Sequence, residues 1–211
     1  MTPAPAQGGG DEALVAYRAL LDRYHRTLDL LSPAGYADID RHLAEAERYA
    51  VAVGELAAVT GPVLDLGSGA GLPGVIVAAR LAPREVWWVE RRRRRATFLT
   101  QVAAQARLSA VRVVAEDVRR LARPADGVAA VTAQAVGTLG DVAALTRHLW
   151  GTRVLIVSRK GPDWPDEFAA LGAWWREDPQ AAGDGWAAPR VLRAEPLGTR
   201  GTLVAVELRG G

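Results

Sequence analysis

The stretch Asp65-Leu66-Gly67-Ser68-Gly69-Ala70-Gly71-Leu72-Pro73-Gly74 decides the fold class of this 211-residue chain. It follows the short apolar run 63–66 and precedes a second apolar run that ends at Leu81. Three glycines at alternate positions allow a tight turn with positive φ and leave bare backbone for a ligand. Strand, glycine-rich turn and helix in this order predict the first unit of an open α/β sheet, which binds ligands at the carboxyl ends of its strands.

Strand and helix segments alternate after this turn. We expect strands at 63–66, 85–89, 111–114, 128–131 and 153–157, and helices at 72–81, 92–107, 118–121, 139–150 and 163–175. Such alternation predicts right-handed crossovers and a parallel sheet with helices on both faces. Two more strands, 190–194 and 202–208, follow with no helix between them. The predicted fold class is α/β: a Rossmann-like, doubly wound, mostly parallel seven-stranded sheet with a terminal antiparallel hairpin.

The residues before the turn have a helical period. Apolar residues recur at helical spacing from Asp11 to about Leu31 and from Tyr36 to Ala58, with a break at 32–35. Residues 1–10 are rich in proline, alanine and glycine and have neither the basic nor the apolar part of a signal peptide. We expect a disordered lead-in over 1–10, a helical extension over 11–60 and the sheet domain over 61–211.

Composition excludes several classes of protein. The absence of cysteine excludes a disulfide scaffold, a cysteine zinc site and a cysteine nucleophile. No apolar run approaches the roughly 20 residues that span a bilayer, so we expect a cytoplasmic protein. The net charge is +2, and Lys160 is the only lysine among the 26 Lys and Arg residues. This mild basicity permits nucleic-acid binding without requiring it.

The glycine turn fits two kinds of cofactor. Residues 69–74 satisfy the GxGxxG pattern of dinucleotide sites, and Glu90 ends the next strand at the spacing of a ribose-binding acid. Asp65, however, stands two residues before the first glycine, where a carboxylate suits a ligand with an ammonium group and repels a pyrophosphate. The terminal hairpin also favours a methyltransferase over a dehydrogenase. We therefore predict S-adenosylmethionine as the cofactor, with a dinucleotide as the alternative.

Residues that follow four of the expected strands are the candidates for binding this cofactor. Asp65 would hold its ammonium group directly or through water, backbone amides of the turn would bind its carboxylate, and Glu90 would accept hydrogen bonds from both ribose hydroxyls. Asp117 would reach the adenine amino group, or would instead cap the short helix at 118–121. The full set is Asp65, Gly67, Ser68, Gly69, Gly71, Leu72, Glu90, Asp117, Val118 and Gln134.

These residues resemble the 16S ribosomal RNA guanine-N7 methyltransferases. The sequence of the turn closely resembles the motif of that family, including its Leu-Pro-Gly end. The segment 133–141 is similar to the one that the family carries after its fourth strand, and Lys160-Gly161 falls where the family has Lys-Gly after its fifth. Arg41-His42-Leu43 is similar to the family's Arg-His segment. The resemblance implies an rRNA methyltransferase whose partner is 16S rRNA or the small ribosomal subunit.

The chain departs from the family near the expected site. Gln134 stands where the family has arginine, Asp29-Leu30-Leu31 where it has Asn-Leu-Thr, and Glu45-Ala46 where it has Asp-Ser. The family's basic tail after the last strand is not found before Gly211. These departures leave two alternatives open: a family-derived methyltransferase that acts on another RNA or a small molecule, and a non-catalytic module that binds S-adenosylmethionine or RNA.

Methylation of guanine N7 requires positioning rather than acid–base chemistry. N7 has a lone pair and no proton, so attack on a sulfonium methyl needs no general base, and we predict no catalytic side chain. His25, His42 and His148 pair neither with one another nor with a carboxylate at metal-site or triad spacing. We therefore expect no metal site.

Four residues are candidates for substrate contact. Lys160 is the first, to a phosphate or guanine O6, because this chain otherwise uses arginine wherever a cation serves. Arg91 to Arg95 wrap more than one helical turn, so we expect most of them to be solvated or paired with acids such as Glu85 or Glu116. Arg91 and Arg92 are candidates for contact with RNA phosphates. His42 is a candidate for contact with the substrate, because of its family position.

We expect the protein to be a monomer.

Overall fold

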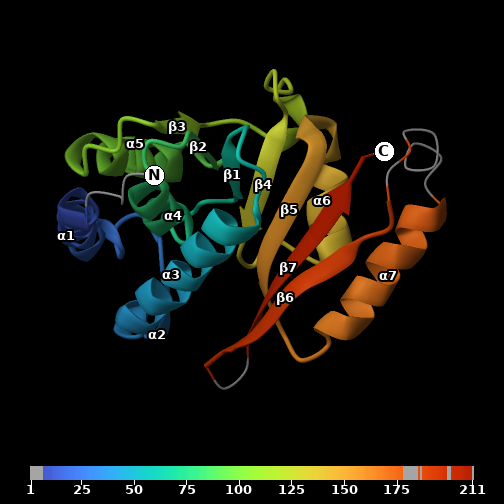
Figure 1. Cartoon of the computed structure of the whole chain (residues 1–211). Coiled ribbons are helices and arrows are strands. Elements are labelled where there is room, and N and C mark those ends of the chain that lie inside the picture. Colours follow the sequence, from blue (N-terminus) through green and yellow to red (C-terminus); the bar gives the residue numbers. More distant parts are fainter. Residues whose placement is uncertain (1–6, 178–184, 186, 199–200, 211) are drawn as a thin grey trace.

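The computed structural model describes residues 7–177, 185, 187–198 and 201–210. Its strands are β1 (Val63–Leu66), β2 (Val86–Val89), β3 (Val111–Val114), β4 (Val128–Ala133), β5 (Trp150–Lys160), β6 (Arg190–Leu197) and β7 (Gly201–Arg209). They form one sheet in the order β3-β2-β1-β4-β5-β7-β6 (Figure 1). The first five strands pair in parallel, and β7 runs antiparallel to β5 and β6. The predicted fold class is confirmed.

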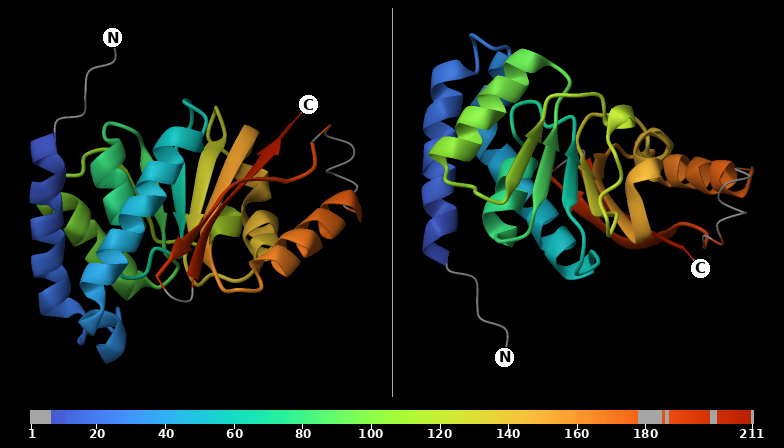
Figure 2. Two further views of the ribbon diagram at one scale, coloured as in Figure 1. Left: turned by 60° about the horizontal axis from the view of Figure 1, so that its bottom comes forward. Right: turned by 90° about the horizontal axis from the view of Figure 1, so that it is seen from above.

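Helices cover both faces of the sheet (Figure 2). They are α1 (Gln7–Tyr24), α2 (Pro33–Ala37), α3 (Ile39–Leu56), α4 (Gly74–Leu81), α5 (Arg93–Gln105), α6 (Leu139–Thr146) and α7 (Trp164–Glu177), with 3-10 turns η1 (Val118–Arg120) and η2 (Arg147–Leu149). Side chains of α1, α3, α4 and α5 belong to one hydrophobic core, and those of α6 and α7 belong to a second. Helices α1 and α7 lie at opposite ends of the molecule (Figure 1).

Each strand of the parallel part contributes to both cores. Val63 belongs to the core under α4 and its neighbour Leu64 to the core under α6. Trp88 belongs to the first of these cores and Trp87 to the second, and both are buried. Side chains alternate between the two faces along a strand, and both faces are covered. The short strands are therefore apolar at almost every position, which is why the sequence predicts them well.

The N-terminal helices share a core with the sheet. Tyr17 of α1 and Tyr49 of α3 lie in the same cluster of buried side chains as Trp88. The guanidinium of Arg80 on α4 joins the two helices, because it pairs with Asp11 and with Glu47, each at 2.8 Å. The predicted boundary between a helical extension and a sheet domain at residue 60/61 stays a prediction, but the two parts are packed as one body.

The first helix differs from its prediction at both ends. It begins at Gln7, inside the predicted lead-in, whose residues 1–6 lie outside the described part of the chain. It ends at Tyr24 and not near Leu31, although the apolar spacing continues that far. Asp29 has a left-handed φ of 49°, and the turn around it brings Leu30 into the core. Tertiary burial of this leucine replaces the last helical turns.

Two other helices start later or are divided. The segment predicted as one helix from Tyr36 is split into α2 and α3, with the side chain of Ser32 capping α2 through the Gly35 N–H. Helix α4 begins at Gly74, so that Pro73 precedes its first turn. Among the described residues, no helix combines the length and apolar character needed to cross a membrane.

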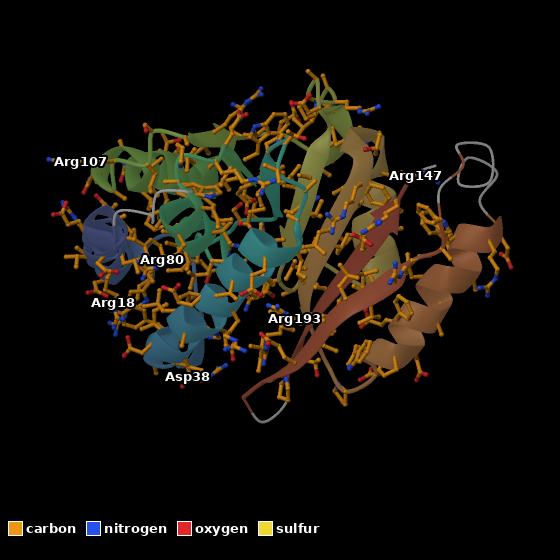
Figure 3. The ribbon with its side chains drawn as sticks, in the orientation of Figure 1. Arg18, Asp38, Arg80, Arg107, Arg147 and Arg193 are labelled. Atoms are coloured by element: carbon orange, nitrogen blue, oxygen red, sulfur yellow. The ribbon has the colours of Figure 1, made fainter. Side chains whose placement is uncertain are left out.

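Ion pairs fasten α3 to the terminal hairpin. Arg193 of β6, which is labelled in Figure 3, pairs with Glu55 at 2.5 Å. Arg48 makes two hydrogen bonds to Glu195, at 2.9 and 2.7 Å. Because β6 is the edge strand of the sheet, these contacts hold the hairpin against the helical layer.

A substitution at Gly127 tests the packing at the amino end of the sheet, away from the glycine turn. Its φ is +70°, and an added Cβ would lie 2.1 Å from the Gly151 nitrogen. We expect Gly127→Ala to lower the free energy of unfolding by about 3 kcal/mol, from left-handed backbone and steric overlap. Gly172→Ala in α7 is the control, because its Cβ would meet only Arg176 at 3.7 Å; it should raise stability by about 0.5–1 kcal/mol. Urea denaturation measures both, and equal effects would contradict the packing.

Candidate active site

A cavity of about 600 Å³ lies at the carboxyl ends of β1 to β4. This volume is within the range of small-molecule sites, roughly 300–1,000 Å³. Of the predicted cofactor residues, those that line it are Gly67, Ser68, Gly69, Leu72, Glu90, Asp117, Val118 and Gln134. The predicted substrate residues Arg91, Arg92 and His42 line it too. Asp65, Gly71 and Lys160 are not among the lining residues.

The glycine turn has the backbone that the sequence predicts. Gly67, Gly69 and Gly71 have φ values of 70°, 52° and 104°. The amides of Gly67 and Ser68 both donate to the Val89 carbonyl at the end of β2, and the Gly71 amide donates to the Ser68 carbonyl. The amide of Gly69 donates to Glu90. These four N–H groups already have acceptors within the protein, so they are not free to bind a ligand carboxylate.

Asp65 lies beneath the turn and not on the cavity wall. Its side chain is 1% exposed, and its Oδ1 accepts a hydrogen bond of 2.7 Å from Thr132 of β4. Its Oδ2 faces the start of α4, where a Cβ on Gly74 would lie only 2.5 Å away. Burial raises the pKa of Asp65 to about 6, against the opposing hydrogen bond from Thr132. Asp65 therefore joins β1, β4 and α4, and Gly74 is glycine because of this close approach.

Glu90 connects the turn to the end of β2. Its Oε2 accepts from the Gly69 N–H at 3.1 Å and its Oε1 from the Arg92 N–H at 2.7 Å. Although the side chain is almost fully buried, it lines the cavity. Each carboxylate oxygen can accept a second hydrogen bond, so Glu90 keeps capacity for two ligand hydroxyls.

Asp117 caps the short helix η1, which is one of its two predicted roles. Its side chain accepts from the Arg119 N–H at 3.0 Å and from the Arg119 guanidinium at 2.6 Å. These contacts hold the pKa of Asp117 well below its usual range. Both residues line the cavity, so the cap leaves Asp117 in place for a ligand. Contact with adenine stays a prediction.

Arg95 is a site residue that the sequence analysis did not single out. Its guanidinium donates to the Asp29 carbonyl at 2.5 Å and lies on the cavity wall beside Leu30 and Leu31. It also lies near Gly69, 3.8 Å from where a Cβ would stand. No local signal separates Arg95 from the other four arginines of its run, because the inward direction depends on how α5 packs.

The acids expected to pair with this arginine run have other partners. Glu85 accepts a hydrogen bond from Trp87, and Glu116 pairs with Arg120 at 3.6 Å. Arg91 to Arg94 are exposed, as expected for most of the run, and Arg95 pairs with Asp29 at 4.0 Å. The structure shows no pairing of the described run with Glu85 or Glu116. Glu85 precedes β2 and the run follows it, so they lie at opposite ends of this strand, and Glu116 has Arg120 of η1 as its neighbour.

His42 lies on the cavity wall next to a carboxylate. Its Nδ1 is 3.8 Å from Oε2 of Glu45, one helical turn further along α3. The prediction that no histidine pairs with a carboxylate is wrong for His42. The i, i+3 spacing of His42 and Glu45 on a helix could have indicated this contact. Burial and the adjacent Arg41 lower the pKa of His42, which favours the neutral imidazole. Within the described residues, no group of three or more potential metal ligands occurs.

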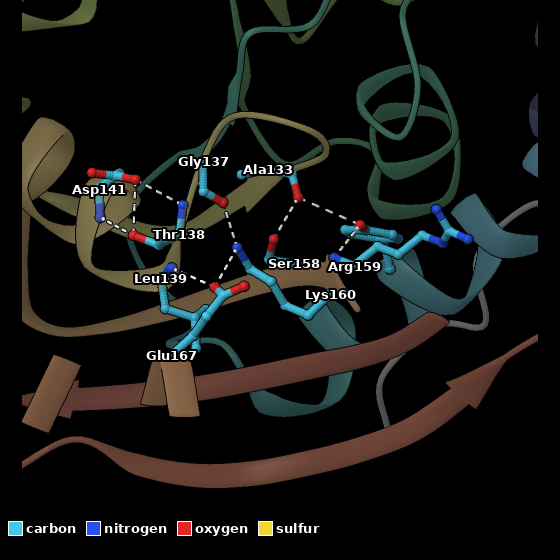
Figure 4. Close-up of polar contacts among 10 residues, drawn as sticks. Ala133, Gly137, Thr138, Leu139, Asp141, Ser158, Arg159, Lys160 and Glu167 are labelled. Atoms are coloured by element: carbon cyan, nitrogen blue, oxygen red, sulfur yellow. Dashed lines mark hydrogen bonds and ion pairs between the residues drawn. The ribbon is translucent and has the colours of Figure 1, made fainter. Parts of the chain in front are cut away.

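Lys160 does not line the cavity. Its side chain is 5% exposed, donates to the Gly137 carbonyl at 2.5 Å and pairs with Glu167 of α7 at 3.0 Å (Figure 4). The structure therefore does not place Lys160 on the cavity wall, and its predicted contact with the substrate stays a prediction. A buried ammonium requires an acidic partner, and Glu167 supplies it from a distant part of the chain.

Comparisons with known proteins give one family. A family model described as rRNA small subunit methyltransferase G (GidB) matches residues 11–178. A ribosomal RNA small subunit methyltransferase G from Ralstonia nicotianae is 31% identical over 176 residues, covering 81% of this chain and 78% of its own. One from Kineococcus radiotolerans is 33% identical over 214 residues, covering 98% and 79%.

Solved structures support the fold at low sequence identity. A SAM-dependent methyltransferase from Aquifex aeolicus has a TM-score of 0.56 and 15% identity, covering 83% of this chain and 93% of its own. TYW2 from M. jannaschii in complex with AdoMet has a TM-score of 0.54 and 16% identity, covering 81% and 77%.

The buried carboxyl of Asp65 predicts a pH dependence of stability. Its pKa of about 6 lies above the ordinary value of 3.8, so the folded state holds the proton more tightly. Stability from this group is greatest below about pH 4 and is lost as the pH rises through 6. We expect the free energy of unfolding, relative to Asp65→Asn, to fall by about 2–3 kcal/mol between pH 4 and 7 in urea titrations without ligand. A pH-independent difference would contradict the raised pKa.

Proposed function

This chain belongs to the rRNA small subunit methyltransferase G family and is an S-adenosylmethionine-dependent enzyme, and we propose that it methylates N7 of a guanine in 16S ribosomal RNA. The observation that carries the proposal is the family match over 11–178, which includes both the glycine turn and the helices beside the cavity. Family membership removes the dinucleotide alternative. The proposed substrate implies a cytoplasmic protein, which we expect to act as a monomer.

The donor set of the cavity fits S-adenosylmethionine. Glu90 and Asp117 end neighbouring strands, where we place the ribose hydroxyls and, with the Val118 N–H, the adenine. Gly67 and Gly69 leave bare backbone for the methionine part. Because Asp65 is buried, we assign its contact with the ammonium group to a bridging water. The remaining predicted members of this set are Ser68, Gly71 beneath the turn, Leu72 and Gln134.

Arg95 is the proposed partner of the cofactor's carboxylate. Four amides of the turn already have acceptors, and this guanidinium is a cationic group beside Gly69. Its bond to the Asp29 carbonyl uses one terminal nitrogen, and the guanidinium carries further donors. Through Arg95, cofactor binding would also hold Leu30 and Leu31 against the cavity.

The chemistry follows from what the bound groups provide. S-adenosylmethionine supplies a methyl group activated by its positive sulfur. The guanine N7 lone pair forms the new bond to carbon while the sulfur–carbon bond breaks, and the positive charge passes to the guanine ring without loss of a proton. The side chains therefore orient the base and exclude water. The apolar residues Leu30, Leu31, Leu72 and Val136 form suitable walls.

Three predicted residues remain candidates for contact with RNA. Arg91 and Arg92 are exposed at the rim, where guanidinium groups reach phosphates. His42 presents a neutral imidazole to the cavity, a group that donates or accepts a hydrogen bond at a base edge. Gln134 lies on the wall where the family has arginine, and this difference favours, as a second candidate function, methylation of another RNA by the same chemistry.

Glu90 gives a direct test of the cofactor site. We expect Glu90→Ala to weaken S-adenosylmethionine binding about 10–100-fold in calorimetry, because hydrogen bonds to a charged acceptor are lost. Glu195→Ala, which removes a carboxylate paired with Arg48 outside the cavity lining, is the control and should bind as the unmodified protein does. Equal affinity of the two variants would remove Glu90 from the proposed site.

The substrate is tested with methyl-labelled S-adenosylmethionine. We incubate the protein with naked 16S rRNA, with assembled small subunits and with no RNA, then digest the RNA and separate the nucleosides. Label in 7-methylguanosine, strongest from small subunits, is the expected result. Label in another nucleoside, or only in an unrelated RNA, would favour the second candidate function. Cofactor binding without transfer to any RNA would overturn both.

A further inference from the structure

The segment from Ala133 to Thr138, here called the wall segment, forms one wall of the cavity. One of its residues has an unusual backbone conformation. Gln134, Ala135 and Val136 line the cavity. Ala135 has a φ of 57°, a left-handed conformation that costs a residue with a side chain on the order of 1 kcal/mol. Such a conformation persists only where surrounding contacts impose it.

The beginning of this wall segment is fixed by two side-chain hydroxyls. The Ala133 carbonyl accepts hydrogen bonds from Ser158 Oγ at 2.9 Å and from the Tyr49 hydroxyl at 3.4 Å. The Tyr49 hydroxyl in turn accepts from the Arg159 N–H at 2.7 Å (Figure 4). The carboxyl end of β4 is thus bound to both β5 and α3.

The other end of the wall segment is fixed by Lys160 and Glu167. Lys160 Nζ donates to the Gly137 carbonyl at 2.5 Å, and Glu167 Oε2 accepts both from Lys160 at 3.0 Å and from the Leu139 N–H at 3.1 Å. One ion pair therefore holds the Gly137 carbonyl, near the end of the segment, and the Leu139 amide at the start of α6. Figure 4 shows the pair between the segment and α7.

We propose that the Lys160–Glu167 ion pair is a positioning device that holds residues 134–136 in the strained conformation that the cavity requires. The identity of the methyl acceptor in this proposal rests on the proposed function. The predicted effect of the ion pair on cofactor affinity does not. Lys160 acts through the Gly137 carbonyl and is not a contact to RNA phosphate. Glu167 is its necessary partner and has no role in the cavity itself.

The ion pair is connected to the glycine turn through the wall segment. A Cβ added at Gly67 would lie 3.1 Å from Val136 Cγ2, so the wall segment is packed directly against the glycine turn. Release of Gly137 frees Ala135 to leave its left-handed conformation, which moves Val136 away from Gly67. Loss of the ion pair should therefore weaken cofactor binding even though neither charged group lines the cavity.

The test compares Lys160→Met, Glu167→Gln and the double variant with a matched ion pair elsewhere. Arg193→Met and Glu55→Gln break a pair between β6 and α3 whose residues do not line the cavity. Five quantities are measured: the melting temperature, the Kd for S-adenosylmethionine by calorimetry, kcat and KM with small subunits, and the salt dependence of RNA binding.

Positioning predicts a specific pattern. Each single variant should weaken S-adenosylmethionine binding about 5–20-fold and lower kcat by a similar factor, and the double variant should be no worse than the poorer single one, because the two residues act as a unit. KM for small subunits should stay within about twofold, and the slope of log affinity against log salt should not change. The matched pair should alter neither Kd nor kcat.

Two results would overturn the proposal. If Lys160→Met lowers the salt slope by about one and raises KM, while Glu167→Gln leaves Kd and kcat unchanged, then Lys160 contacts an RNA phosphate. If the variants lower only the melting temperature, the pair serves stability alone. Failure of the unmodified protein to methylate any RNA would overturn the proposed function instead, and the calorimetric comparison would still decide the positioning role.

Discussion

The carboxylate of Asp65 is buried at the end of β1, beneath the glycine turn that lines the cavity. Thr132 of β4 donates to one oxygen, and Gly74 at the start of α4 approaches the other. The turn between them has no room for side chains at several positions and bends through left-handed glycines. A buried carboxyl is costly unless its surroundings are exact in shape and hydrogen bonding. Its burial therefore constrains β1, β4 and α4 together, and the ligand site lies above the point where they meet.

The helices that precede the sheet are part of this site. The hydroxyl of Tyr17, on α1, donates to the Ala70 carbonyl inside the glycine turn at 3.0 Å. The hydroxyl of Tyr49, on α3, reaches the Ala133 carbonyl behind the opposite wall. Both tyrosines are buried, and burial raises the pKa of each, so they stay neutral donors. The N-terminal helices thus support both walls of the cavity.

Charged side chains divide between the rim and the interior according to their solvation. Arg91 and Arg92 lie exposed at the rim, where guanidinium groups keep most of their water and act as candidate RNA contacts. Lys160 and Glu167 instead neutralise one another behind the wall segment, where a single ammonium and carboxylate fit between backbone groups. Arg95 is intermediate, because it lines the cavity while holding the Asp29 carbonyl.

The sequence by itself determined the mostly parallel sheet with its terminal hairpin, the glycine turn and the family, because each depends on residues close together in the chain. Short apolar runs, glycines that need positive φ and acids at strand ends are local signals. The tertiary structure alone decided that α1 ends at Tyr24, that Arg95 turns inward and that Lys160 is bound by Glu167. These outcomes depend on contacts between distant segments: Leu30 with the core, α5 with the loop after α1, and β5 with α7. No local pattern encodes them, because burial and charge neutralisation are settled only when the layers pack.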